Sequence, residues 1–275
     1  MTKFKCKIND LQKICKMVSL TGKSEATGKE YRSILDMNIN ALATNELSIE
    51  AIDTLKHLGL SLHYLIDSVE QEGSLPIGDI ELFENFLERF NSDDIVTVET
   101  VSNRIVITRE NPRKVAKVPM ASLEAILSKD VPFFKTLGFS KTNFVETEKL
   151  KPNLKIVFDA EAMQNVIADG DVVKQRIYPW IIKDGKFTVT VGTETYGEIE
   201  TEIKLTSIES NPENPGPQTV ETGYSSGIDN LFGNFSGKVI VYLVDQLKEA
   251  PLIFEQKSDK YHIIIALAPY TIKEA

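Results

Sequence analysis

Three groups of residues in this sequence have types and spacings that could carry chemistry, and the first imitates the end of a phosphate-binding loop. Residues 21–24 read TGKS, but the position that would hold the first glycine of such a loop is Met17. The run also follows an expected helix, whereas phosphate binding requires backbone amides at the start of a helix. We therefore interpret residues 21–24 as a loop after the first helix.

Histidines and paired aspartates form the second group. The three histidines are His57, His63 and His262. They show no spacing typical of zinc ligands. The aspartate pairs at positions 93 and 94 and at 169 and 171 could hold a magnesium ion, but each pair falls where a turn is expected, and aspartate is a common turn residue. We expect no metal site, no cofactor and no histidine-based catalysis.

Nucleophilic residues are the third group. Cys6 and Cys15 are the two cysteines, and Cys15 lies on the apolar stripe of an expected helix. We interpret both as small reduced core residues of an intracellular protein. The sequence contains no recognisable Ser-His-Asp or Cys-His grouping, so we expect that the protein is not an enzyme. The alternative from that class is a metal-dependent enzyme that uses the acidic clusters.

Length and composition set the frame for these residues. The chain has 275 residues, is 42% hydrophobic and carries a net charge of −9. A chain of this length can bury two ordinary cores, so we expect two domains. The negative charge disfavours an anionic membrane or nucleic acid as a partner unless positive charge is concentrated locally. No apolar run approaches about 18 residues, so we expect neither a signal peptide nor a membrane span.

Four short segments have apolar residues at the spacing of a helix with one buried face. The stripes are Leu11, Ile14, Cys15 and Val18; Phe83, Phe86, Leu87 and Phe90; Met163, Val166 and Ile167; and Ile228, Leu231, Phe232 and Phe235. Each stripe is followed by alternating sequence that is typical of strands, so each helix should lie on a sheet and turn its other face to water. Two stripes fall in each half, which predicts one α+β unit used twice.

The ends of these elements can be placed from local signals. Asn9 is a plausible N-cap for the first helix and Asp79 for the second, and the third should run from 159 to 168 and stop at Gly170. Hairpin turns are expected at residues 102–103 and at Asp184-Gly185. We expect an N-terminal domain at 1–120, a connector at 121–153 that lies on the body of the protein, and a C-terminal domain at 154–275.

The end of the chain resembles the closing strands of the DNA sliding clamps of the proliferating cell nuclear antigen (PCNA) family. The residues that carry this resemblance are "APLIFE" at 250–255 and "LAP" at 267–269. Residues 47–53, "LSIEAID", and 93–98, "DDIVTV", are similar to two strands of the same family. The order and spacing of the four segments extend the resemblance over essentially the whole chain.

The resemblance implies a clamp fold in which two similar α+β domains carry their helices on one face of antiparallel sheets. It also implies a homotrimeric ring with pseudo-sixfold symmetry, with the helices around a central hole. Ring closure would pair an edge strand at 114–119 with an edge strand at 187–191 of the next subunit. The interface residues would be Val115, Lys117, Pro119, Phe187, Val189 and Val191.

The function implied by the resemblance is that of a processivity factor in DNA replication and repair. Such a ring encircles double-stranded DNA, is loaded by an ATP-driven clamp loader, and tethers DNA polymerase and other proteins through clamp-binding peptides. It would act inside the cell, in the cytoplasm and nucleoid or in the nucleus. The partner-peptide pocket would use Ile52, Leu58, Leu60, Leu127, Val131, Pro251, Ala268 and Pro269.

Charge on the expected helices departs from what a DNA channel favours. Lys13, Lys16 and Lys23 are the candidates to face DNA, but the second and third helices each carry a net charge of −3. A weakly attracting ring could still slide, because topological linkage does not require tight binding. The alternatives are a clamp-like adaptor that has lost DNA encirclement and one subunit of a mixed ring.

Overall fold

The chain forms two compact units in the computed structural model, which describes residues 1–23, 30–55, 57–127, 138–139, 145–146, 152–175, 177–193, 195, 197–215, 219–224, 227–243 and 252–268. Unit 1 comprises Met1–Phe134 together with Lys257–Ile264, and unit 2 comprises Lys135–Gln256 together with Ile265–Ala275. Lys257–Ile264 thus groups with the first unit, although the sequence pattern assigns it to the second domain. Most of the expected connector lies outside the described residues.

Unit 1 contains a five-stranded antiparallel sheet. Its order is β11 (Lys114–Pro119), β10 (Arg104–Arg109), β9 (Ile95–Val101), β1 (Lys3–Lys7) and β7 (Ser68–Gln71). The predicted hairpin between β9 and β10 is confirmed, with Ser102 at φ 54° in its turn. Val96, Val98, Ile105 and Ile107 point into the core, and the alternation along these strands leaves the other face to solvent.

A second set of strands in unit 1 follows the order β8 (Gly73–Ile77), β4 (Met37–Leu42), β5 (Glu46–Ile52) and β6 (Leu58–Leu65). The last described strand, β22 (Tyr261–Leu267), lies beside β6. Ile39 pairs with Ile49, and Ile49 pairs with Leu62, so one face carries a row of buried aliphatic residues. A short hairpin of β2 (Thr21–Lys23) and β3 (Glu30–Arg32) follows the first helix.

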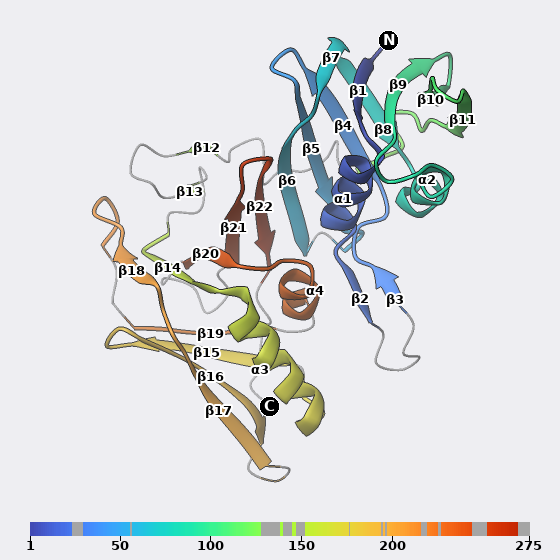
Figure 1. The fold of residues 1–275 in the computed structure, drawn as a ribbon. Helices are drawn as coiled ribbons and strands as arrows, with labels where there is room; N and C mark the ends of the chain where they lie inside the picture. Colours follow the sequence, from blue (N-terminus) through green and yellow to red (C-terminus); the bar gives the residue numbers. More distant parts are fainter. Residues whose placement is uncertain are drawn as a thin grey trace. The chain divides into compact units, whose positions relative to one another are not determined.

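Two helices cover the core of unit 1 and lie side by side (Figure 1). α1 spans Ile8–Ser19 and α2 spans Ile80–Leu87. Asp79 is the N-cap of α2, as predicted, and its Oδ1 accepts the N–H of Leu82 at 2.8 Å. The N-cap expected at Asn9 is wrong: α1 begins at Ile8, and the N-cap residue is Lys7, whose side chain makes no cap hydrogen bond. Backbone carbonyls take that role, because the Ile8 N–H bonds the carbonyl of Asp94 and the Asn9 N–H bonds that of Ser92.

Unit 2 also contains two sets of antiparallel strands. One has the order β17 (Gly197–Ile203), β16 (Lys186–Thr193), β15 (Tyr178–Lys183) and β19 (Val220–Tyr224). The other has the order β18 (Ser207–Ser210), β14 (Leu154–Asp159), β20 (Lys238–Leu243) and β21 (Leu252–Lys257). A two-residue ladder joins β12 (Gly138–Phe139) to β13 (Val145–Glu146). The predicted Asp184-Gly185 turn is confirmed, with both residues at positive φ.

The helices of unit 2 are α3 (Ala160–Val173) and α4 (Gly227–Gly233), and they pack against each other (Figure 1). The predicted end of α3 at Gly170 is wrong, because the helix continues to Val173. Gly170 is buried inside the helix, where a β-carbon would lie 3.1 Å from a ring atom of Tyr178. The core below these helices is aromatic, and Trp180 packs against Phe187 and Tyr224 at ring-centroid distances of 4.8 and 5.0 Å.

Candidate nucleic-acid face, ring edges and partner pocket

The exposed side of α1 carries two of the three lysines that were expected to face DNA. α1 buries Leu11, Ile14 and Val18 and leaves Lys13 and Lys16 exposed one turn apart. Among the described residues neither ammonium group has an ion-pair partner. Lys23 lies in β2, and its side chain is outside the described part of the structure. α1 therefore offers two free positive charges on one face.

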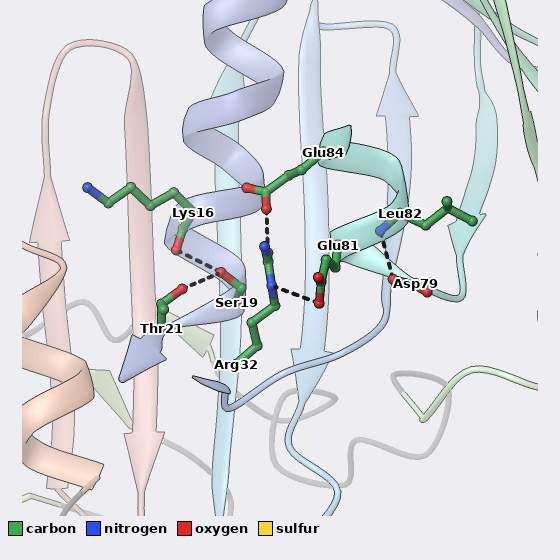
Figure 2. A network of polar contacts seen from close by, with 8 residues as sticks. All are labelled: Lys16, Ser19, Thr21, Arg32, Asp79, Glu81, Leu82 and Glu84. Atoms are coloured by element: carbon green, nitrogen blue, oxygen red, sulfur yellow. Dashed lines mark hydrogen bonds and ion pairs between the residues drawn. The ribbon is translucent and has the colours of Figure 1, made fainter. Parts of the chain in front are cut away.

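The exposed side of α2 is acidic, and an arginine from a distant strand partly neutralises it (Figure 2). Arg32 in β3 donates from Nη1 to Glu84, and its Nε lies 3.9 Å from Oε2 of Glu81. Arg32 and Glu84 are 52 positions apart, so no local signal in the sequence pairs them. With Arg32 beside it, α2 therefore presents less net negative charge to solvent than the −3 expected from its own residues.

The end of α1 leads into Thr21–Lys23, which form strand β2 rather than the expected loop, and residue 24 lies outside the described residues. The Ser19 hydroxyl lies 3.4 Å from the Lys16 carbonyl and 3.3 Å from the Thr21 hydroxyl (Figure 2). The Ser19 carbonyl accepts the Ser33 N–H. These contacts close the helix and start strand β2. Because Thr21–Lys23 form a strand after a helix, they do not provide the helix start that a phosphate loop needs.

The helices of unit 2 remain acidic in the structure. Asp159 caps α3 by accepting the Glu161 N–H at 3.2 Å, and both side chains are exposed. Asp171 adds a further exposed carboxylate because α3 is longer than expected. The amide of Gln164 donates to the carbonyls of Phe232 and Phe235, both at 2.9 Å, and so fixes α3 to the end of α4. Neither α3 nor α4 contains a lysine or arginine, so neither helix itself offers a cation to a phosphate.

One predicted ring edge is a true edge and the other is not. β11 is the last strand of its sheet, and Val115, Lys117 and Pro119 are all exposed. A groove of about 760 Å³ runs beside β11 and is lined by Phe86, Val101, Ser102, Asn103, Arg104, Val106, Lys117 and Pro119. The groove thus combines apolar residues with two cations.

The edge strand predicted at 187–191 is wrong. β16 lies between β15 and β17 and uses both of its hydrogen-bonding sides, and Phe187, Val189 and Val191 are buried in the core of unit 2. Among the described strands the edges of this sheet are β19 and β17, and β17 is the one that lies beside β16. The outward side chains of β17 include Glu198, Glu200 and Glu202, all at the surface. The alternation of apolar and polar residues could not show which of β16 and β17 is the edge strand, because every second residue points inward in both.

The described residues of the predicted partner pocket fall into three environments. Ile52, Leu58 and Leu60 are buried, and the turn that joins their strands is closed by Asp53, whose Oδ1 accepts the Leu58 N–H at 2.8 Å. Leu127 is half-buried, and its N–H bonds the carboxylate of Asp36. Ala268 is exposed directly after β22. Val131, Pro251 and Pro269 lie outside the described residues.

Within the described ranges no group of three or more His, Cys, Asp or Glu residues could hold a metal ion. Cys6 and Cys15 are free and buried, and burial raises the pKa of both thiols, so they favour the unreactive protonated form.

No helix in the described part of the chain is both long and apolar enough to cross a bilayer.

Comparison with known proteins finds similarity in structure but not in sequence. No protein-family model and no curated protein matches the chain. Solved structures that are similar over nearly its whole length include PCNA from Thermococcus kodakaraensis. That structure has a TM-score of 0.70 and 13% identity, with 98% of this chain and 100% of that chain covered.

Another is A. fulgidus PCNA bound to the C-terminal region of FEN-1, with a TM-score of 0.69 and 14% identity over 100% of both chains. The DNA polymerase III beta chain from Streptococcus pneumoniae has a TM-score of 0.71 and 12% identity over 99% of this chain and 65% of that one. The two helices per unit, the antiparallel sheets behind them and this full-length similarity show that the chain has the fold of the PCNA-type sliding clamps.

Proposed function

We propose that this chain is a DNA sliding clamp: it forms a ring around duplex DNA and tethers polymerase and other replication or repair proteins. The observation that carries the proposal is the similarity of the fold over 98% or more of the chain to PCNA and to the DNA polymerase III beta chain. The role is mechanical rather than enzymatic, and it belongs inside the cell, where DNA is replicated.

The DNA-facing side would be the exposed faces of the helices. Lys13 and Lys16 are the free cations on α1, and each phosphate contact that they make would be weakened by salt. The acidic faces of α2 and α3 keep the attraction weak, so the linkage to DNA would be topological and would need an ATP-driven loader. A ring that holds DNA loosely can slide along it.

Ring closure would pair two unlike edge strands, β11 of one subunit and β17 of the next. β11 presents Lys117, which pairs with Val106 of β10. β17 presents Glu198, Glu200 and Glu202, of which Glu202 also lies 3.5 Å from Lys186. If β17 of one subunit pairs with β11 of the next, the free backbone groups of both edges are satisfied and opposite charges meet. A head-to-tail contact of this kind closes into a ring when the rotation fits, and three copies of a two-unit chain would give six similar units.

Partner binding would use a hydrophobic pocket built around Ile52, Leu58 and Leu60, with Leu127, Val131, Pro251, Ala268 and Pro269 as its other members. The structural neighbour from A. fulgidus was solved with the C-terminal region of FEN-1, which supports a peptide-binding role for the clamp fold. A few buried apolar anchors of the peptide would supply most of the affinity.

A second candidate is a clamp-like adaptor, or one subunit of a mixed ring, with weak or no DNA encirclement. The observation that favours it is the acidic surface of α3, where Asp159, Glu161 and Asp171 are exposed. Such a protein would keep the clamp fold and the partner pocket while another subunit supplied the basic residues.

Retention on circular DNA separates these functions. The full chain is loaded onto a nicked circular duplex with a clamp loader, isolated with the circle by gel filtration, and then treated with an enzyme that cuts the circle once. A clamp stays on the closed circle and leaves after the cut. A protein that never co-elutes with the circle, alone or with loader, is not an encircling clamp, and one that binds equally to linear DNA holds it by contact alone.

A further inference from the structure

The carboxylate of Asp10 is almost completely buried, and it is paired with a lysine from the far end of the chain. The Asp10 side chain is 3% exposed and lies in the first turn of α1. Lys260, in the turn that precedes β22, places Nζ 3.0 Å from Oδ1 and 3.3 Å from Oδ2 of Asp10. Both residues belong to unit 1, although 250 positions separate them.

The surroundings of this ion pair fix Lys260 in place. The Tyr64 hydroxyl donates to Asp10 Oδ1 at 2.9 Å, and the Tyr64 ring stacks on Tyr261 with centroids 6.4 Å apart. The Leu65 N–H bonds the Lys260 carbonyl at 2.8 Å. The Ser258 hydroxyl accepts the N–H groups of Lys260 and Tyr261, which holds the turn tight. The turn is thus attached to α1 by charge and to β6 by the backbone.

Access differs sharply between the two partners. The side chain of Lys260 is 56% exposed, so solvent and other molecules reach it, whereas Asp10 is closed off. If the ammonium lost its charge, the buried carboxylate would keep the Tyr64 hydroxyl but lose its counter-ion, and an unpaired buried charge is costly. The charge of the exposed Lys260 amine therefore decides whether the buried Asp10 carboxylate keeps its counter-ion.

We propose that Lys260 is a charge-controlled latch that fastens the turn before β22 to α1, and that acylation of its amine opens the latch. In that step the ammonium loses a proton to solvent. The nitrogen then forms an amide bond with the acyl carbon of an acyl thioester, while the C–S bond breaks and the thiol leaves. The product is neutral and cannot pair with Asp10, so the turn and the start of β22 separate more often from β6.

Hydrogen exchange of the full chain, followed by mass spectrometry, tests the latch. Lys260→Gln, and the protein carrying acetyl-lysine at position 260, should exchange the amides of Leu65 and residues 261–264 roughly tenfold faster, because a hydrogen bond to a charged group is removed. Lys260→Arg should keep the protection. Lys183→Gln, which neutralises an exposed lysine in unit 2, is the matched control and should change nothing at these amides.

A double variant shows whether Asp10 is the partner. In an Asp10→Asn background the buried charge is already gone, so adding Lys260→Gln should have little further effect on exchange. Exchange in Lys260→Gln that matches the unchanged protein would overturn the latch, and so would an equal effect of Lys260→Gln with and without Asp10. DNA plays no part in this readout, so the result is independent of the clamp proposal.

Discussion

At the scale of single residues, Lys13 and Lys16 are the side chains on which DNA binding would depend. Both are exposed on the same side of α1 and have no ion-pair partner in the described ranges. We expect Lys13→Glu with Lys16→Glu to weaken DNA association, and to lower the slope of log affinity against log salt by about one unit for each phosphate that is no longer neutralised. Fluorescence anisotropy with a duplex at several salt concentrations measures both quantities.

The matched control for the lysine pair is Lys183→Glu, which changes an exposed lysine at the hairpin turn of unit 2. This variant should keep the salt slope of the unchanged protein. An equal weakening in the control and in the α1 variant would mean that only the overall charge matters, and α1 would have no special role in binding DNA.

Glu70 is a second residue whose environment makes a measurable prediction. It bonds Lys3 at 2.7 Å and Lys5 at 2.9 Å and so ties β7 to β1. The hydrogen bond from Lys3, followed by that from Lys5, lowers the pKa of Glu70 from its usual 4.5 to about 2. Because the folded-state pKa is depressed, this stabilisation is present above about pH 4.5 and is lost as the pH falls towards 2.

We therefore expect Glu70→Gln to lower the urea midpoint at neutral pH and to make no difference near pH 2. Urea unfolding between pH 7 and pH 2 measures the change, and Glu110→Gln, at an exposed glutamate in the turn after β10, is the control. A Glu70→Gln midpoint that differs from the unchanged protein by the same amount at every pH would show that the ion pairs are not its source.

The residues that sequence reasoning found, and those it missed, differ in how far away their partners lie. The cap at Asp79 acts three positions away, so local patterns were enough to identify it. Arg32 and Lys260 pair with residues 52 and 250 positions away, and the sequence around either residue does not indicate its partner. Their roles follow only from the tertiary fold.

At the scale of elements, α2 depends on its caps because it has only eight residues. Asp79 accepts the Leu82 N–H at its start, and at its end the Lys114 ammonium lies at the Arg89 carbonyl and 5.0 Å from the centre of the Phe90 ring. We expect Asp79→Ala to lower the free energy of unfolding by about 1 kcal/mol, measured by urea denaturation.

The control for this cap is Asp93→Ala, which removes an exposed aspartate from the turn before β9. It should change the free energy of unfolding by less than about 0.5 kcal/mol, as surface substitutions usually do. Asp79→Asn should retain most of the stability, since asparagine is also a good N-cap. A loss of stability in Asp79→Asn as large as in Asp79→Ala would show that charge, rather than the cap hydrogen bond, is what α2 needs.

Helix positions were predictable from periodicity, whereas element ends, several strands such as β17, and strand order were not. Each of the four apolar stripes overlaps a helix, because the spacing of buried residues within one helix is local information, although Phe90 and Phe235 lie beyond the ends of α2 and α4. α3 passes through Gly170, where a β-carbon would lie 2.8 Å from the Gln175 carbonyl oxygen and 3.1 Å from the Tyr178 ring. This close packing outweighs the weak helix propensity of glycine. The order β17-β16-β15-β19 is a property of the whole sheet and could not be obtained from β16 alone.

At the scale of the whole molecule, the sequence predicted two similar units. The structure also divides into two units, but one segment near the end of the chain groups with the first unit. Lys257–Ile264 belongs to unit 1, where the turn pairs with Asp10 and β22 starts beside β6. A chain that returns to its first unit cannot be recognised from repeats, because the repeat pattern assigns each segment to the nearest unit along the sequence.

Assembly of the whole molecule into a ring would depend on the charges of its two edges. β11 carries Lys117 and β17 carries Glu200 among its glutamates, so Lys117→Glu or Glu200→Lys alone places like charges together at every interface. We expect each single variant to weaken self-association roughly tenfold in sedimentation velocity, and the double variant, which restores opposite charges, to recover most of the affinity. Lys183→Glu, away from both edges, should assemble normally. If the double variant is as defective as the sum of the single variants, the two edges do not meet, because only a direct contact makes the second substitution repair the first.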